Sequence, residues 1–312
     1  MMRSAAGACA GLLRAGAVAA VCWRLVRGGR PAPPIDGADV VTSTPPGAAL
    51  QTQASTGPTA PPTITVVVPA RDEADRIGPL LDAVTTAPGV AEVIVVDDES
   101  TDRTADEATG RGARVVTGSP RPPGWAGKTW ALEQGIAAAT TQWVVALDAD
   151  TRPDPALPLA MISRLLAEDL DLLSVGGRFD CPTPGARWLH AAMLTTLVYR
   201  FGPPGGRHPN RSNRLLANGQ CMAFERARLV AAGGFGAVAG SVVEDVALVR
   251  RLADSGHRVA FLDASDLLTV RMFEDLASTW HGWGRSLGLR GVEPTWRRAL
   301  AATLLTATMP LP

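Results

Sequence analysis

Between residues 63 and 150 the chain alternates apolar runs with helical patterns. Residues 63–71 (TITVVVPAR), 91–100 (AEVIVVDDES) and 142–150 (QWVVALDAD) each contain a continuous apolar run in which valine is frequent. Such runs are typical of strands buried on both faces of a sheet. A shorter run at residues 114–119 (RVVTGS) predicts one more strand.

Helical patterns separate the predicted strands. The apolar positions of residues 77–84 share one helix face, and residues 101–113 and 127–140 are expected to form two further helices. Strands that alternate with helices indicate an α/β fold with a mostly parallel sheet and right-handed crossovers.

The second half of the chain contains two longer segments with helical character. Residues 186–204 (ARWLHAAMLTTLVYRFGPP) are largely apolar, and we favour a core helix there over a lipid-binding groove. Residues 244–256 (EDVALVRRLADSG) predict a helix whose apolar side chains share one face and which ends at Gly256.

The N-terminal part differs in composition from this domain. Within residues 1–27, an apolar stretch is long enough for a membrane anchor, although Arg14 and many small residues weaken it. A cleaved signal peptide and a wrongly chosen start codon are the alternatives. Residues 28–62 are rich in Pro, Gly, Ser, Thr and Ala and predict a flexible linker.

The flanking charges and the C-terminal segment bear on localisation. Arg24, Arg27 and Arg30 follow the N-terminal apolar stretch, and positive flanks stay on the cytoplasmic side. We therefore expect a cell-membrane protein whose main domain, residues 63–290, is cytoplasmic. Residues 291–312 form an apolar segment that is a candidate for membrane association, although its last fourteen residues are too few to span a bilayer.

The overall composition excludes several classes of partner. The 312 residues include 30 Lys+Arg and 30 Asp+Glu, so the net charge gives no reason to expect a nucleic acid. The four cysteines lack CxxC spacing, which disfavours a disulfide framework and a zinc finger. The histidines are scattered, and we do not expect them to bind a metal.

Polar clusters follow three of the predicted strands. Residues 69–73 (PARDE) follow the first strand, Asp97 and Asp98 the second, and residues 148–150 (DAD) the fourth. In parallel α/β sheets ligands bind beyond the carboxyl ends of the strands. We therefore expect the three clusters to meet at one rim.

Two glycine-containing segments suggest nucleotide binding but do not match its motifs. Residues 124–129 (GWAGKT) resemble the end of a P-loop, yet Pro122 stands where the first glycine is needed and no strand leads directly into the segment. Residues 233–240 (GGFGAVAG) do not give GxGxxG. The sequence therefore disfavours an NTPase and a dinucleotide-binding protein.

Asp148 and Asp150 are separated only by Ala149. Two carboxylates about 4 Å apart repel each other by roughly 4 kcal/mol at an effective dielectric constant of 20. If the strand continues through them, their side chains point to the same side, where Mg²⁺ or Mn²⁺ would bind both. A solvated Asp-x-Asp turn with no function is the alternative.

The order of these motifs resembles that of family 2 glycosyltransferases with the GT-A fold, a Rossmann-like, mostly parallel sheet flanked by helices. The resemblance rests on residues 69–73, 95–102 (VVDDESTD), 148–150 and 244–245 (ED), and it covers roughly residues 63–290. The segments GWAGKTWAL, LANGQCMAF and EDVALVRRL are most similar to the membrane-associated branch that acts on isoprenoid-type lipids such as carotenoid or hopanoid precursors.

The resemblance implies a binding site for a nucleotide-sugar donor. Asp98 would contact its uracil or ribose, Lys128 would approach the nucleotide or diphosphate, and Asp148 would lie against the ribose and a metal ion. Asp150 would bind Mn²⁺ or Mg²⁺ directly. The implied donor-binding residues are Pro69, Arg71, Glu73, Asp97, Asp98, Lys128 and Asp148. Glu73 as a helix-start carboxylate and Lys128 as a solvated lysine are the structural alternatives.

The resemblance also implies that Asp245, with Glu244 beside it, is the general base for an acceptor hydroxyl. Acidic residues at a helix N-terminus are favourable by about 0.3–1 kcal/mol without any catalytic role. The glycine-rich residues 231–243, which look mobile, would suit an acceptor loop. The implied reaction is a metal-dependent, inverting transfer of one hexose-type sugar, from a UDP-linked donor to a small or lipid acceptor.

One family feature is missing. Processive members carry Gln-x-x-Arg-Trp after the base, and its absence here favours the transfer of a single sugar. Trp280, Trp283 and Arg285 are candidates for a substitute wall around the substrates, or for anchors at a membrane surface.

Two other functions remain as alternatives. A nucleotidyltransferase would carry a loop rich in glycine and arginine after its first strand, where this chain has PARDEADR. A non-catalytic nucleotide-sugar-binding protein would bind the donor without transferring the sugar.

Overall fold

The computed structural model describes residues 32–39, 62–202, 204–205, 212–271, 273–289 and 291–308, together with positions 15, 16, 18, 19 and 23. For residues 285, 286 and 304–308 it describes the backbone alone. The candidate anchor in residues 1–27 therefore lies almost entirely outside the described residues.

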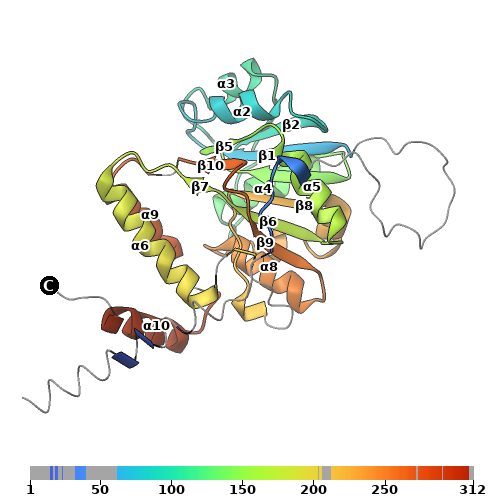
Figure 1. Cartoon of the computed structure of the whole chain (residues 1–312). Coiled ribbons are helices and arrows are strands. Elements are labelled where there is room, and N and C mark those ends of the chain that lie inside the picture. Colours follow the sequence, from blue (N-terminus) through green and yellow to red (C-terminus); the bar gives the residue numbers. More distant parts are fainter. Residues whose placement is uncertain are drawn as a thin grey trace, which may run out of the picture.

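A seven-stranded sheet forms the centre of the protein (Figure 1). Its strands are β1 (Ile64–Ala70), β2 (Val90–Asp97), β3 (Arg114–Thr117), β4 (Trp143–Leu147), β6 (Leu172–Gly176), β8 (Cys221–Glu225) and β9 (Val259–Asp263). The order is β3-β2-β1-β4-β8-β6-β9, and β8 runs antiparallel to both its neighbours while the other neighbouring pairs are parallel. The predicted α/β fold with a mostly parallel sheet is confirmed.

Helices cover both faces of this sheet. One face is covered by α2 (Gly78–Val84), α3 (Thr104–Gly110) and α5 (Leu157–Ala167), the other by α4 (Gly127–Ala138), α7 (Arg226–Ala231) and α8 (Glu244–Asp254). Successive strand residues point to opposite faces, so Val66 and Val68 join the first core and Val67 joins the second. Burial on both faces explains why β1 is apolar throughout.

Helix α4 lies unusually close to the sheet because of Gly135. A Cβ atom at this position would lie 2.4 Å from Cγ1 of Val67 on β1. Because glycine has no side chain, the backbone of α4 can lie close to β1. This contact fixes the position of α4 and of its first residue, Gly127.

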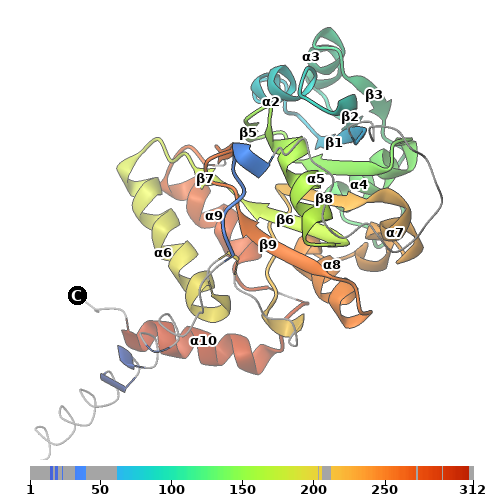
Figure 2. The same ribbon diagram turned by 45° about the vertical axis from the view of Figure 1, so that its right-hand side comes forward.

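A second, smaller sheet lies beside the first. Its strands are β5 (Thr151–Pro153), β10 (Leu268–Val270) and β7 (Arg178–Phe179), in the order β5-β10-β7. Helix α6 (Pro184–Phe201) follows β7, and α9 (Leu276–Ser286) follows β10. Figures 1 and 2 show these two helices side by side, extending away from the central sheet.

Short helical turns complete the fold: η1 (Gly37–Asp39), η2 (Ser212–Arg214) and η3 (Phe235–Val238). The prediction of a flexible linker is wrong for residues 32–39, which pack on the domain. Ile35 is fully buried and donates its backbone N–H to Asp263 O at 2.8 Å, and Arg164 pairs with Asp39 at 3.0 Å. Apart from Pro62, the rest of the predicted linker lies outside the described residues.

The predicted C-terminal segment contains α10 (Thr295–Thr308), which lies near the end of α6 in Figure 2. Within the described parts of the chain, no helix has both the length and the hydropathy that a bilayer span requires.

Candidate functional site

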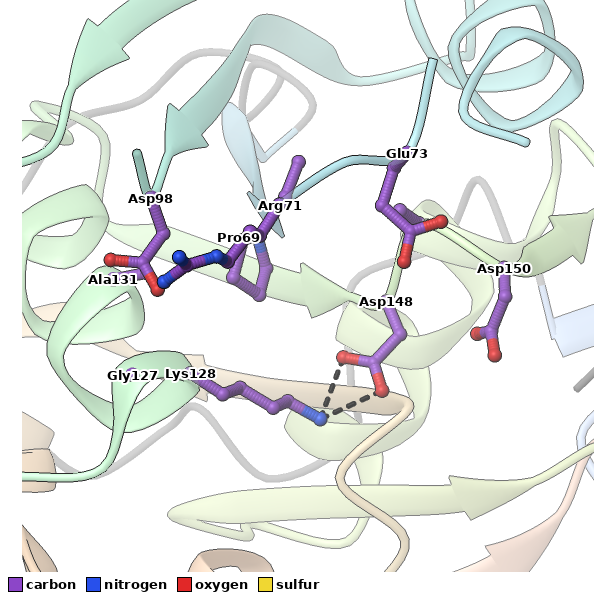
Figure 3. Close-up of a pocket in the computed structure, with 11 residues that line it drawn as sticks. Pro69, Arg71, Glu73, Asp98, Gly127, Lys128, Ala131, Asp148 and Asp150 are labelled. Atoms are coloured by element: carbon purple, nitrogen blue, oxygen red, sulfur yellow. Dashed lines mark hydrogen bonds and ion pairs between the residues drawn. The ribbon is translucent and has the colours of Figure 1, made fainter. Parts of the chain in front are cut away.

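A pocket opens where the strand order reverses, between β1 and β4. The chain proceeds from β1 to β2 and β3 on one side, whereas β4 lies on the other side of β1. Ligands bind at such switch points, beyond the carboxyl ends of the strands. The pocket has a volume of about 360 Å³, and its lining consists of Pro69, Ala70, Arg71, Glu73, Asp98, Gly127, Lys128, Ala131, Asp148, Ala149 and Asp150. The three polar clusters thus meet at one rim, as expected (Figure 3).

The loop after β1 is held by residues that follow β2. Asp72, whose φ of 54° lies in the left-handed region, accepts the backbone N–H of Thr101 at 2.7 Å. Asp102 accepts the N–H of Ala74 at 3.0 Å, and Thr104 accepts the N–H of Glu73 at 2.8 Å. These contacts fix the loop that carries Arg71 and Glu73.

The sequence reasoning missed the roles of these supporting residues. The signal was present, because Asp, Ser and Thr side chains after a strand commonly bind nearby backbone amides. It did not show that the partners would lie about thirty positions away in the sequence.

Asp148 and Asp150 lie in a turn rather than in a strand, because β4 ends at Leu147. The turn is closed by the backbone N–H and the hydroxyl of Thr151, which donate to Asp148 O at 3.1 and 2.7 Å. The strand therefore does not continue through the two carboxylates, although both line the pocket.

Asp150 is held in an unfavourable environment. Its Oδ1 is buried and has no hydrogen-bond partner among the described residues. Burial, followed by the charge of Asp148, raises the pKa of Asp150 to about 7, while Lys128 opposes the shift. Burial also raises the pKa of Glu73, although Glu73 pairs with Arg76 at 2.8 Å.

Lys128, on the first turn of α4, connects two groups of carboxylates. Its Nζ lies 2.7 Å from Asp148 and 3.5 Å from Oε1 of Glu244, and it donates to Gly219 O at 3.2 Å. Burial lowers the pKa of Lys128, but the carboxylates of Asp148, Glu244 and Asp245 raise it overall. The ammonium is therefore positively charged and is not a solvated lysine. Figure 3 shows it pointing across the pocket floor to Asp148.

Glu244 and Asp245 lie beyond Lys128, at the start of α8, and are not part of the pocket lining. Asp245 accepts the backbone N–H groups of Gly219 at 2.8 Å and Val246 at 2.7 Å. Burial, followed by the charge of Glu244, raises the pKa of Asp245 to about 6.

Position 219 leaves little room for a side chain. A Cβ atom there would lie 3.2 Å from Cβ of Asp245 and 3.3 Å from Nζ of Lys128, tighter than ordinary van der Waals contact.

Besides Glu244 and Asp245, three predicted site residues with described side chains lie outside the pocket lining: Asp97, Trp280 and Trp283. Asp97 ends β2 and accepts the N–H of Ser100 at 3.1 Å. Trp283 donates to Nδ1 of His190 on α6 at 3.0 Å, and Trp280 is exposed. The side chain of Arg285 lies outside the described residues. The substitute wall around the substrates therefore stays a prediction.

The pocket chemistry suits a hard divalent cation. Within the described residues no group of three His, Cys, Asp or Glu side chains is arranged to hold a metal. The chain does supply Asp148 and the partnerless Oδ1 of Asp150. Mg²⁺ characteristically binds one or two carboxylates and takes its other ligands from substrate phosphates and water. The residues present fit Mg²⁺ or Mn²⁺ held jointly with a diphosphate.

Comparison with known sequences identifies the family to which the chain belongs, and the matched region contains the pocket. The profile of the family described as "Glycosyl transferase family 2" matches residues 65–228. This chain belongs to that family. The matched region runs from β1 to α7 and includes the whole pocket lining.

One curated relative is the 4,4'-diaponeurosporenoate glycosyltransferase of Staphylococcus aureus (strain USA300). It is 41% identical over 88 residues, which amount to 28% of this chain and 24% of the relative. The match thus spans about a quarter of the relative's length.

Two solved structures are similar over most of the chain. A mycobacterial protein has a TM-score of 0.51 and 26% identity, with 75% of this chain and 76% of that chain covered. Glucosyl-3-phosphoglycerate synthase from Mycobacterium tuberculosis, in complex with phosphoglyceric acid, has a TM-score of 0.50 and 25% identity, with coverages of 75% and 82%. Together with the family match they confirm the GT-A fold.

Proposed function

We propose that the protein is a glycosyltransferase that moves one sugar, with inversion, from a UDP-linked donor to a hydroxyl group of a small or lipid acceptor. The observation that carries the proposal is the acidic pocket at the β1/β4 switch point of a family 2 chain. Family membership indicates a glycosyltransferase; the use of a metal ion, the UDP-linked donor, the inversion at the anomeric carbon and the kind of acceptor are proposed here in addition.

In this proposal the pocket holds the donor. Asp98 and Arg71 lie at one side of the pocket and Asp148, Glu73 and Asp150 at the other (Figure 3). The nucleoside would lie on the first side and the diphosphate on the second, where Asp150 and Asp148 would bind Mn²⁺ or Mg²⁺. When bound, the metal ion supplies electrostatic stabilisation of the leaving diphosphate. Lys128 holds Asp148 in position and adds positive charge beside the same phosphates.

Asp245 is the proposed general base. Its carboxylate takes the proton of the acceptor hydroxyl as that oxygen bonds to the anomeric carbon and the bond to the diphosphate breaks. Glu244 raises the proton affinity of Asp245, and the amide of Gly219 orients one of its oxygens. Because the attack comes from the face opposite the leaving group, an α-linked donor gives a β-glycoside.

A lipid acceptor is supported by the carotenoid-type compound in the name of the Staphylococcus relative. We also propose that the domain works at the cytoplasmic face of the cell membrane. Trp188 on α6, Trp280 on α9 and Trp296 on α10 are 70%, 60% and 63% exposed, and exposed tryptophan is enriched at membrane interfaces.

The test is to incubate the protein with Mn²⁺, lipid extract and a panel of UDP- and GDP-sugars, and to measure release of the nucleoside diphosphate. We expect release with one UDP-sugar and loss of release in EDTA or in Asp150→Ala. Release of pyrophosphate instead would favour a nucleotidyltransferase. Donor binding with no release under any condition would favour the non-catalytic alternative.

Asp150→Asn tests the metal site separately. The folded-state pKa of Asp150, about 7, lies above its ordinary 3.8, so the stability tied to this shift is present below pH 3.8 and lost as pH rises through 7. At pH 8 in EDTA, Asp150→Asn is therefore expected to have a higher Tm than the wild type. Addition of Mn²⁺ and UDP should raise the Tm of the wild type but not that of the variant. An unchanged response to Mn²⁺ would exclude Asp150 as a ligand.

A further inference from the structure

The small sheet carries two arginines on one face, beside the pocket. Thr269 on β10 pairs directly with Arg152 on β5 and with Arg178 on β7. Directly paired residues of neighbouring strands project from the same face of a sheet. The three side chains therefore form a row, with the threonine hydroxyl in the middle.

The opposite face of this sheet is apolar and buried, which fixes the direction of the row. Thr151, Pro153, Leu268 and Val270 are buried there, and Phe179 packs against the same core. Arg178 donates to Oγ1 of Thr269 at 3.4 Å, so its guanidinium group lies over the central strand, toward the strand of Arg152.

Neither arginine is held by a close ion pair, although the charges of Asp150 and Glu73 act on Arg152. Arg152 donates to the carbonyl oxygen of Thr151 at 2.7 Å, and neither it nor Arg178 forms an ion pair within the described residues. Arg271, a third arginine nearby, is already paired with Glu274 at 3.2 Å and is also influenced by Asp180. Two guanidinium groups without a close ion pair, in one row with a threonine hydroxyl, form a donor set that suits a carboxylate or phosphate, which Arg binds through two parallel hydrogen bonds.

The position of the row separates it from the proposed donor site. Arg152 follows Asp150 by two residues, and the backbone N–H of Arg271 donates to Asp150 O at 3.2 Å. The row is therefore next to the metal side of the pocket, yet Arg152, Arg178 and Thr269 are not part of the pocket lining. An anion bound by the row would be distinct from the diphosphate inside the pocket.

We propose that Arg152 and Arg178, with the hydroxyl of Thr269, bind a carboxylate or phosphate group carried by the acceptor. This inference rests on the proposed function and specifies its acceptor as an acidic compound. The anionic group orients the acceptor beside the pocket, and a separate hydroxyl of the same molecule receives the sugar.

The experiment compares hydroxy acids with their methyl esters, in a long-chain and a short-chain series, as acceptors with Mn²⁺ and the accepted UDP-sugar. We expect the wild type to prefer the acid in one series, which also identifies the kind of acceptor. Arg152→Gln and Arg178→Gln should each raise KM for the acid by about tenfold and leave the ester unchanged. Arg251→Gln, an exposed arginine on α8, is the matched control and should behave as the wild type.

Three results would overturn the inference. The first is an acid preference that is the same in the wild type and the variants. The second is a fall in UDP affinity, measured by calorimetry with Mn²⁺, in the arginine variants; this result would assign the arginines to the donor site. Weaker binding to phosphatidylglycerol vesicles with an unchanged acid preference would assign the row to the membrane surface. If the wild type transfers sugar to no acceptor, the proposed function fails, and calorimetric binding of the hydroxy acid alone still tests the arginine row.

Discussion

A single ammonium group connects the two acidic parts of the site. Lys128 contacts Asp148 in the pocket and Glu244 at the start of α8. It also donates a hydrogen bond to the carbonyl oxygen of Gly219. Three acidic side chains can therefore lie close together in a half-buried region because a shared positive charge offsets their repulsion.

The pKa of Asp245 gives a prediction for the pH dependence. Its folded-state value, about 6, lies above the ordinary 3.8, and a general base must be deprotonated. We expect kcat/KM to fall about tenfold per pH unit below pH 6. Glu244→Gln removes a charge that raises this pKa, so the fall should move to lower pH. A profile that is flat from pH 7 to 4, or that moves to higher pH in Glu244→Gln, would contradict the assignment.

Residue types and their order predicted most of the pocket but not its internal contacts. Glu73, Asp98 and Asp148 were expected at the rim because each follows a strand, and Lys128 because the family resemblance implies it; all four line the pocket. The link from Lys128 to Glu244 could not be predicted, because it depends on how α4 and α8 pack on the same sheet face. Asp97 was expected beside Asp98, but successive residues of an extended chain point to opposite sides, and only Asp98 lines the pocket.

At the scale of elements, continuous apolar runs were the reliable signal. The runs at residues 63–71 and 91–100 correspond to β1 (Ile64–Ala70) and β2 (Val90–Asp97) within two or three residues at each end. The small sheet was not predicted, because strands of two or three residues are too short to show a periodic pattern.

The segment before α8 was expected to be mobile and is instead packed. Phe235 is fully buried, and its backbone N–H donates to Glu133 on α4 at 2.9 Å. Gly233 and Gly234 have φ values of 97° and 55°, a positive range that glycine adopts more readily than other residues.

The contact between α4 and β1 gives a prediction for stability. Gly135→Ala would place a methyl group 2.4 Å from Cγ1 of Val67, and overpacking of this kind typically lowers the free energy of unfolding by about 1–3 kcal/mol. Gly110→Ala is the matched control, because no atom lies within 4 Å of its Cβ position. Urea unfolding should separate the two variants, and equal midpoints would show that α4 can move away from the sheet without loss.

At the scale of the whole molecule, three exposed tryptophans lie on helices outside the two helical layers that cover the central sheet. Trp188, Trp280 and Trp296 belong to α6, α9 and α10, helices that lie to one side of the central sheet (Figures 1 and 2), whereas the pocket lies at the carboxyl ends of β1 and β4. This division is consistent with one part of the molecule contacting a lipid surface while another binds a soluble nucleotide-sugar.

Vesicle flotation tests the membrane proposal. Replacing the three tryptophans with serine should weaken binding to vesicles by at least about tenfold, since aromatic side chains contribute strongly to interfacial binding. Val230→Ser on α7, also exposed, is the control and should float as the wild type. Equal flotation of the triple variant would place the membrane contact elsewhere.

The most direct test of the central claim, that this pocket transfers a sugar with Asp245 as its base, is the turnover of Asp245→Asn with saturating UDP-sugar and acceptor. The account predicts that kcat falls by about 10²–10⁴-fold while UDP affinity, measured by calorimetry with Mn²⁺, stays within a few-fold of wild type. Asp254→Asn, at the other end of α8, should keep full activity. Wild-type turnover in Asp245→Asn would contradict the account.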